Sequence, residues 1–372
     1  MENVDLPLQP PIDPMLAKAA TKVPDGPWSY EPKWDGFRAL VFRDGDEVII
    51  QSRNGKELGR YFPELLEALR EEVAPKCVLD GEVVVPREMD GRIRLDWESL
   101  SQRIHPAASR VQMLAEQTPA HFIGFDALAD SGQSLLAEPF RVRRAALQEL
   151  VNPKQWCHVT RATDDAAQGT HWLTTFEGAG LDGVIAKRLD GPYLPGKREM
   201  VKVKHARDVD CVAIGYRIHK SGAGLGSILL GLYRDGVLQM VGGAVSFTVK
   251  ERLQLLAELE PLRTGDARDG EASRWNSAAD KTWIPIRPEK VCEVAYDQME
   301  GNRFRHTVKF RRWRPDRDPD SCTFDQLDVP LNYDLYDVLE TSGPGERSDG
   351  EEYPGERSDG KEYPGERSDG KE

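Results

Sequence analysis

The chain of 372 residues is longer than one hydrophobic core usually supports, so we expect two domains and a tail. Apolar residues make up 39%, enough for packed cores, and no run approaches the roughly 18 apolar residues of a membrane-spanning helix. The formal net charge of −13 argues against tight nonspecific DNA binding, which needs an excess of Lys and Arg.

The cysteines and the first residues predict an unexported protein. Five scattered cysteines without a Cys-x-x-Cys spacing argue against a disulfide framework or a structural zinc site. The chain begins with neither a basic segment nor an apolar stretch. We therefore expect a reducing, cytoplasmic location and no membrane contact.

Strand and helix patterns alternate through the first half of the chain. Apolar runs at 39–43 and 47–51 flank turn residues and predict a hairpin. An amphipathic helix is expected from Phe62-Pro63, and a strand at 78–85. Residues 139–151 predict a second amphipathic helix with arginines on its outer face. Such mixed elements, ending at Lys204, favour an α+β domain built on antiparallel sheets.

Short strands dominate after Lys204. Apolar runs at 210–216, 228–233 and 291–296, with one helix near 250–259, fit a five-stranded barrel of the oligonucleotide-binding (OB) type. Glycines at 222–226 lack the strand-loop-helix setting and the terminal Lys-Ser/Thr of a phosphate loop, so they predict a turn.

The chain ends in copies of the decapeptide YPGERSDGKE, preceded by a near copy. With Pro and Gly throughout and no aliphatic residue, this repeat cannot offset the entropy of ordering, so we expect disorder. Residues 341–372 carry ten acidic and five basic groups, which leaves −8 of the net charge on the body. Within that body, residues 302–314 are locally very basic and predict a cationic groove.

The most informative segment, residues 31–38, reads EPKWDGFR. Its lysine, Lys33, indicates a covalent phosphoryl-transfer site. A lysine amine attacks phosphorus only when neutral, so it needs desolvation or nearby cations. Further lysines should converge on it, and Lys187, Lys202 and Lys204 lie on or beside apolar runs that read as strands. In a strand, Lys-x-Lys points both side chains to one face.

Other motifs follow in a fixed order. They read SRNG (52–55), LDGE (79–82), FIGFD (122–126), DGVIAK (182–187) and KVK (202–204). Alone, Lys-x-Asp-Gly is more often a lysine entering a turn before a strand. The ordered set, over residues 5–330, resembles the ATP-dependent DNA ligases of the covalent nucleotidyltransferase superfamily, above all the compact bacterial (mycobacterial and actinobacterial C-type) ligases.

The resemblance implies a fold and a reaction. Residues 1–204 would form a nucleotidyltransferase (ATP-grasp-like, antiparallel sheets) adenylation domain, 205–330 an OB-fold domain, and 331–372 a disordered tail. The enzyme would seal 5′-phosphate/3′-hydroxyl nicks in duplex DNA through a lysyl-AMP intermediate, as a nucleoid-associated monomer in DNA repair. It would use ATP and Mg²⁺ or Mn²⁺, and the barrel would rotate between ATP capture and sealing.

The same resemblance assigns roles to the charged residues. Lys33 would form the phosphoramide with AMP. Cations beside the α-phosphate would be Lys187, Lys202 and Lys204. Carboxylates for a phosphate-bound metal would be Glu82 and Asp182, with the ribose hydroxyl as an alternative partner of Glu82. Asp182 replaces the glutamate that is more frequent in the family, and Met200 stands where relatives commonly carry tryptophan.

Nucleotide and DNA contacts are implied in the same way. Phe125 would stack on adenine, and Glu31 would accept a hydrogen bond from its amino group. Contacts to the sugar-phosphate and to the 5′-phosphate of the nick would come from Arg38 and Arg53. Arg314 and Arg317 would align the pyrophosphate opposite Lys33, although both also fit a DNA-backbone patch.

Two alternatives remain open from the sequence. An RNA ligase or capping-type nucleotidyltransferase shares the superfamily, and preference for a 2′-hydroxyl cannot be deduced from these residues. A noncatalytic single-strand-binding module built on the barrel would leave the four lysines unexplained.

Overall fold

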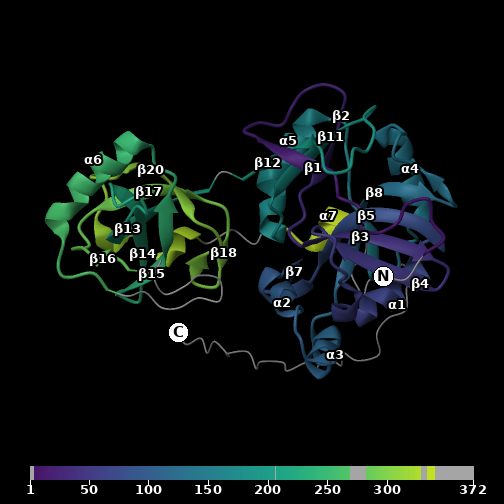
Figure 1. Ribbon diagram of the computed structural model, residues 1–372, viewed down its shortest axis with the longest axis horizontal. Coiled ribbons are helices and arrows are strands. Elements are labelled where there is room, and N and C mark those ends of the chain that lie inside the picture. Colours follow the sequence, from purple (N-terminus) through teal and green to yellow (C-terminus); the bar gives the residue numbers. More distant parts are fainter. Residues whose placement is uncertain (1–3, 206, 269–281, 328–332, 340–372) are drawn as a thin grey trace, which may run out of the picture.

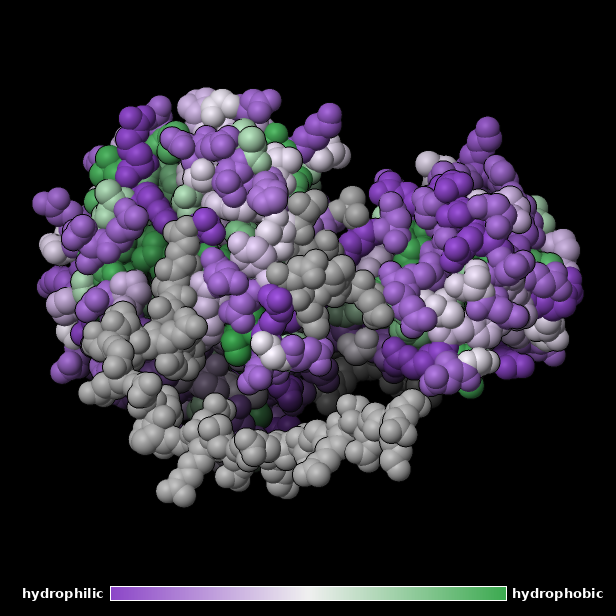
Figure 2. Space-filling model, turned by 180° about the vertical axis from the view of Figure 1, so that it is seen from behind, coloured by the Kyte–Doolittle hydropathy of each residue, from purple (hydrophilic) through white to green (hydrophobic). Residues whose placement is uncertain are grey.

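The computed structural model describes residues 4–205, 207–268, 282–327 and 333–339. It has two lobes (Figure 1), the first built on two β-sheets and the second on a barrel. Both lobes are mainly hydrophilic on the face seen in Figure 2, with apolar residues in small groups. In the part of the chain described here, no helix combines the length and the apolar character needed to cross a membrane.

The first sheet of the first lobe has four strands. Its order is β1 (Leu16–Ala20), β12 (Arg198–Lys204), β11 (Gly183–Arg188) and β2 (Trp28–Pro32). The pairing of β1 with β12 is parallel and the other two pairings are antiparallel. Alternate residues of β11 and β12 fill the core, namely Val184, Ala186, Val201 and Val203. The intervening residues face a pocket, among them Ile185, Lys187, Met200 and Lys202.

The second sheet carries the expected hairpin. Its order is β10 (Cys157–Val159), β8 (His121–Asp130), β5 (Lys76–Val84), β3 (Phe37–Asp44) and β4 (Glu47–Ser52), with β9 (Gln133–Ser134) paired to β8. All pairings except that of β10 with β8 are antiparallel. A separate hairpin joins β6 (Pro86–Met89) to β7 (Arg92–Leu95). The α+β prediction is thus confirmed.

Helices pack against these sheets or against one another. They are α1 (Pro63–Glu72), α2 (Trp97–Gln102), α3 (Ala108–Gln117), α4 (Phe140–Leu150) and α5 (Ala166–Thr175). The expectation of arginines on the outer face of α4 was wrong for Arg143, which is 1% exposed. Its Nε and Nη2 donate to the two carboxylate oxygens of Asp126 at 2.8 and 3.1 Å, because a buried cation needs a buried partner.

The second lobe is a closed five-stranded barrel, as expected. Its strands are β13 (Arg207–Ile218), β14 (Leu225–Arg234), β15 (Val237–Val245), β20 (Val308–Trp313) and β17 (Val291–Tyr296), and the β14–β13 pairing closes the ring. Short strands β16 (Ile284–Pro285), β18 (Met299–Glu300) and β19 (Arg303–Phe304) and helix α6 (Val249–Leu259) complete it. The glycine-rich turn joins β13 to β14, with positive φ at Gly222 and Gly224. All five cysteines are buried and free.

The C-terminal boundary differs from the expectation. Residues 335–339, predicted to be disordered, form helix α7 (Leu335–Leu339) with Leu335, Val338 and Leu339 buried. The four apolar or aromatic residues of this segment provide the burial that the decapeptide repeats cannot. The repeats themselves lie outside the described residues.

Candidate active site

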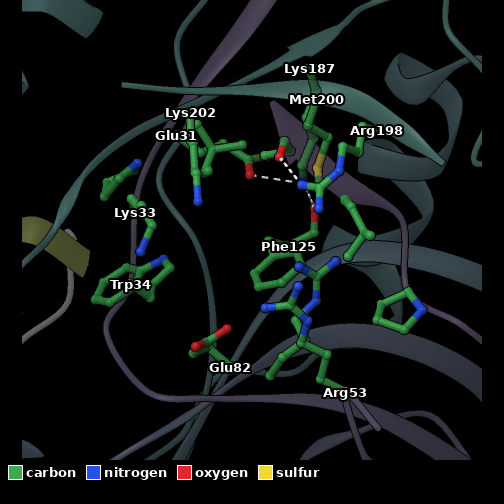
Figure 3. Close-up of a pocket in the computed structure, with 16 residues that line it drawn as sticks. Glu31, Lys33, Trp34, Arg53, Glu82, Phe125, Lys187, Arg198, Met200 and Lys202 are labelled. Carbon is green, nitrogen blue, oxygen red and sulfur yellow. Dashed lines mark hydrogen bonds and ion pairs between the residues drawn. The ribbon is translucent and has the colours of Figure 1, made fainter. Parts of the chain in front are cut away.

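A pocket lies between the two sheets of the first lobe (Figure 3). One wall comes from β2, β11 and β12, which contribute Glu31, Lys187 and Lys202. The other wall contains Phe125 of β8, Glu82 of β5 and Arg38 of β3. Lys33, which directly follows β2, lies at the edge of the pocket, and this edge opens into a cleft toward the barrel. The fold thus brings together motifs that are about 170 positions apart, as expected for one site.

A chain of alternating charges leads from Lys33 to the barrel. The Nζ of Lys33 donates to Oδ2 of Asp182 at 2.5 Å. The same oxygen lies 3.1 Å from Nζ of Lys204, which also contacts Oδ2 of Asp297 of the barrel at 2.6 Å. Burial opposes ionisation of Asp182, but the ammonium groups of Lys33 and Lys204 outweigh it and lower its pKa. Asp182 is therefore a carboxylate held between two cations.

Lys202 faces the same region from β12. Lys202 and Lys204 lie on one face of the strand, as the Lys-x-Lys spacing predicted. Burial and the positive charges of Lys204 and Lys33 lower the pKa of the Lys202 ammonium. These lysines form a cationic region suited to a phosphate group.

Lys187 has a different environment from the one expected for a phosphate contact. It is 3% exposed, and its Nζ donates to the carbonyl oxygen of Phe125 at 2.5 Å and lies 2.9 Å from Oε2 of Glu31. Its ammonium also lies over the ring of Phe125, 4.7 Å from the centroid. Because an ammonium buried this deeply needs a counter-ion, Lys187 pairs with the buried Glu31, and it still lines the pocket. Its place beside the α-phosphate stays a prediction.

Glu31 presents an unoccupied hydrogen-bond acceptor to the pocket. Its side chain is 3% exposed and its Oε2 is engaged by Lys187, whereas its Oε1 is buried with no hydrogen-bond partner among the residues that the structure describes. Burial raises the pKa of the Glu31 carboxyl, against the opposing charges of Lys187 and Arg144. A buried acceptor without a donor is costly, so the site is suited to a ligand N–H.

Arg38 and Phe125 form the opposite wall. Nε and Nη2 of Arg38 donate to the two oxygens of Asp80, each at 2.6 Å. Burial disfavours the Arg38 cation, but Asp80 outweighs this effect and raises its pKa. The guanidinium carbon lies 4.6 Å from the centroid of the Phe125 ring. Arg38 is thus fixed in orientation, whereas Arg53 is exposed where the pocket meets the cleft.

Glu82 lies where the pocket and the cleft meet. Its Oε1 accepts a hydrogen bond from the backbone N of Gly36 at 3.2 Å. Burial raises the pKa of the Glu82 carboxyl to about 7, against the charges of Arg38 and Lys33.

The carboxylates suit a metal that arrives with a nucleotide. Among the residues that the structure describes, no cluster of three or more His, Cys, Asp or Glu side chains is arranged to hold a metal. Asp182 and Glu82 nevertheless line one cleft, and Mg²⁺ is commonly bound by one or two carboxylates together with substrate phosphates and water. The donor set therefore fits a phosphate-bound Mg²⁺.

The cleft also contains a contact that sequence reasoning missed. Nη1 of Arg305, on the barrel, lies 3.0 and 2.9 Å from the two oxygens of Asp35, which belongs to the Lys33 motif. The Arg305 guanidinium carbon is 3.4 Å from the centroid of a Trp97 ring. The only signal in the sequence was the basic stretch at 302–314, which does not identify a partner.

Arg314 and Arg317 are not opposite Lys33 in this conformation. Arg314 lies 2.9 Å from Asp210 and 2.7 Å from Asp316, and Arg317 lies 3.3 Å from Asp210, all within the barrel. Neither arginine is among the described residues that line the pocket or the cleft. In this conformation the two arginines do not take the expected position, because the segment after β20 places both side chains beside acidic groups of the barrel. Their contact with pyrophosphate stays a prediction.

Two sheets that enclose a lysine-rich pocket, followed by an OB-type barrel, define a covalent nucleotidyltransferase of the polynucleotide ligase type. Comparison with known proteins supports this class. Residues 14–204 match the ATP dependent DNA ligase domain, and residues 221–317 match the ATP dependent DNA ligase C terminal region. The chain belongs to the ATP-dependent DNA ligase family.

Individual relatives agree with this assignment. The chain is 79% identical to DNA ligase C1 of Mycolicibacterium smegmatis over 346 residues, covering 91% of this chain and 99% of the relative. It is 50% identical to DNA ligase C of Mycobacterium tuberculosis, covering 90% and 99%. A solved Lig E DNA ligase superposes with a TM-score of 0.50 at 17% identity, over 81% of this chain and 99% of that one, and supports the fold. The resemblance to compact bacterial ligases is confirmed, which disfavours the capping-type and noncatalytic alternatives.

Proposed function

We propose that this enzyme seals nicks in duplex DNA in three steps and that Lys33 carries the activated AMP. In the first step, Nζ of Lys33 forms a bond to the α-phosphorus of ATP, its proton is lost, and pyrophosphate leaves. In the second, AMP passes from Lys33 to the 5′-phosphate of the nick. In the third, the 3′-hydroxyl attacks that phosphate, and AMP leaves.

The observation that carries this proposal is the set of charges around Lys33. Asp182 orients the Nζ, and Lys202 and Lys204 supply fixed positive charge where a phosphate would lie. Asp182 and Glu82 would hold a phosphate-bound Mg²⁺, which would supply additional charge stabilisation. Arg53 would contact the 5′-phosphate of the nick, and the cleft between the lobes would hold the duplex. The enzyme would act as a monomer in DNA repair.

A nick that ends in a 3′-dideoxynucleotide tests this sequence of steps. Such a nick can accept AMP on its 5′-phosphate but lacks the hydroxyl for the last step. The enzyme with ATP and Mg²⁺ should convert it to an adenylated strand, and should seal the matched 3′-hydroxyl nick. Formation of neither product would contradict the proposal.

Glu31 is proposed to recognise the amino group of adenine through its free Oε1. Glu31→Gln replaces an acceptor by a group that can also donate to the 6-oxo group of guanine. Since a hydrogen bond to a charged group contributes about 1.5–3 kcal/mol, the preference for ATP over GTP should fall about ten- to hundredfold. The ratio of the adenylation rates with ATP and with GTP is measured on the same preparation of each protein. A general loss of activity lowers both rates equally and leaves this ratio unchanged. An unchanged ratio would refute the assignment.

Glu82 predicts a pH dependence with a definite sign. Burial raises the pKa of Glu82 to about 7, above its ordinary value of 4.5, so the folded protein favours the neutral carboxyl. The stability that this gives is present at low pH and is lost as the pH rises from about 4.5 to about 7, so wild type should lose thermal stability relative to Glu82→Gln over that range, as melting curves can show. If ionised Glu82 binds the ribose or the metal, the adenylation rate of wild type should rise as the pH passes through about 7. Parallel pH profiles of the two proteins would contradict both expectations.

A further inference from the structure

The chain crosses between the lobes twice. The first crossing, between β12 and β13, is the domain boundary expected from the sequence. The second follows the last barrel segment, η6 (Phe324–Leu327), after which α7 packs on the first lobe. Figure 1 shows α7, in the yellow of the chain end, among the elements of the first lobe.

α7 is an integral part of the core of the first lobe. Leu335, Val338 and Leu339 are 1%, 0% and 6% exposed and belong to the cluster that contains Trp172 and Phe176. This core therefore includes side chains that the chain supplies only after it has built the barrel.

Polar and aromatic contacts fix the start of the helix. Oδ2 of Asp334 accepts a hydrogen bond from the backbone N of Ile93 on β7 at 2.7 Å, and its Oδ1 accepts from Tyr336 N at 2.9 Å. The ring of Tyr333 lies 5.1 Å from the ring of Phe176. Because hydrogen bonds are directional, these contacts hold α7 in one position on the first lobe, which apolar contacts alone would not do.

The barrel end of this connection is equally well fixed. Gln326 donates from Nε2 to the carbonyl of Asp210 at 3.2 Å and accepts from its backbone N at 3.3 Å. Phe324 is 8% exposed in the barrel core. Five residues, 328–332, join the two fixed ends, and an extended chain advances at most about 3.6 Å per residue. While α7 is docked, Leu327 can therefore lie no farther than roughly 22 Å from Tyr333.

We propose that α7 is a positioning element for the DNA-dependent steps. Attached at both ends, the barrel can rotate only about an axis near its two connections, and it is held close to the face where Arg305 reaches Asp35. In this arrangement Arg314 and Arg317 pair with Asp210 of the barrel and are not among the described residues that line the pocket and cleft around Lys33. α7 thus favours the lobe arrangement used on a nick over the one used for ATP capture. This inference rests on the proposed function.

Two truncations separate α7 from the repeats. A chain that ends at residue 332 lacks both, whereas a chain that ends at residue 339 lacks only the segment beyond α7 and serves as the matched control. Val338→Asp in the full chain tests docking without a truncation, and Val338→Ala is a milder change should the aspartate variant fail to fold. For each protein we would measure the rate of Lys33 adenylation, the rate of sealing of a pre-adenylated nick, and Tm.

The expected result is a split between the two steps. Loss of α7 docking should lower sealing of the pre-adenylated nick several-fold while adenylation by ATP is retained, and the chain ending at 339 should behave like wild type. A merely structural role would lower both rates together with Tm, and this outcome, or no change in either rate, would overturn the proposal. Failure of wild type to form lysyl-AMP would instead refute the proposed function.

A distance measurement gives an independent readout. Lys154 and Val249 are exposed on different lobes, and the five native cysteines are buried, so Lys154→Cys and Val249→Cys can be labelled selectively. The distribution of distances between the labels should broaden in the chain ending at 332 and not in the chain ending at 339. Equal distributions would show that α7 does not restrain the barrel.

Discussion

Lys33→Ala is expected to abolish the mass increase of one AMP that wild type acquires with ATP and Mg²⁺. Lys33→Arg should behave in the same way, because a guanidinium keeps the positive charge but is not a usable nucleophile. Nick sealing should fall roughly 10⁴-fold or more, as in other enzymes that lose a covalent nucleophile. Intact mass spectrometry, followed by peptide mapping, measures both the adduct and its position.

Lys154→Ala is the matched control for this experiment. Lys154 is an exposed lysine of the same lobe and lies outside the pocket, so its removal should leave the adduct in place. An adduct that persists in Lys33→Ala, or that maps to another side chain of wild type, would remove the basis of the proposed function.

Arg305→Ala should impair sealing while Lys33 is still adenylated. The pair with Asp35 is 15% and 12% exposed, and a charge-assisted contact of this kind contributes about 1.5–3 kcal/mol. If it stabilises the lobe arrangement that acts on DNA, sealing of a pre-adenylated nick should fall about ten- to hundredfold. The nucleotide pocket between the sheets does not include Arg305 among its described lining residues, so the AMP adduct should persist.

A double-mutant cycle with Asp35→Asn tests the contact itself. Coupled residues give effects that do not add, so the double variant should be less impaired than the sum of the single ones. Arg303→Ala, an exposed arginine of the adjacent strand, is the control for the loss of a positive charge near the cleft. Strictly additive effects of the two substitutions, or an equal loss of sealing in Arg303→Ala, would show that Arg305 acts through its positive charge alone and not through its contact with Asp35.

Local patterns were sufficient to predict much of the fold. The apolar runs on either side of the turn near residue 45 became β3 and β4, and the run at 291–296 became β17. Such elements depend on side-chain alternation and turn residues, which are properties of neighbouring positions. The Lys-x-Lys spacing placed Lys202 and Lys204 on one face for the same reason.

Partners distant in the sequence could not be predicted in this way. An arginine on an amphipathic helix resembles any solvent-facing charge until its neighbours are known, and Arg143 turned out to pair with Asp126 in the interior. Lys187 likewise took the buried Glu31 as its partner, which the alternation along β11 alone did not reveal.

The sequence by itself determined the family, the two lobes and the identity of the proposed nucleophile, because ordered motifs and strand periodicity are local. Only the tertiary structure decided that Arg305 contacts Asp35, that Arg314 and Arg317 face the barrel, and that α7 returns to the first lobe. Each of these depends on segments more than a hundred residues apart, or on how an arginine pairs within its own domain. Burial and charge neutralisation select such partners only after the chain has folded.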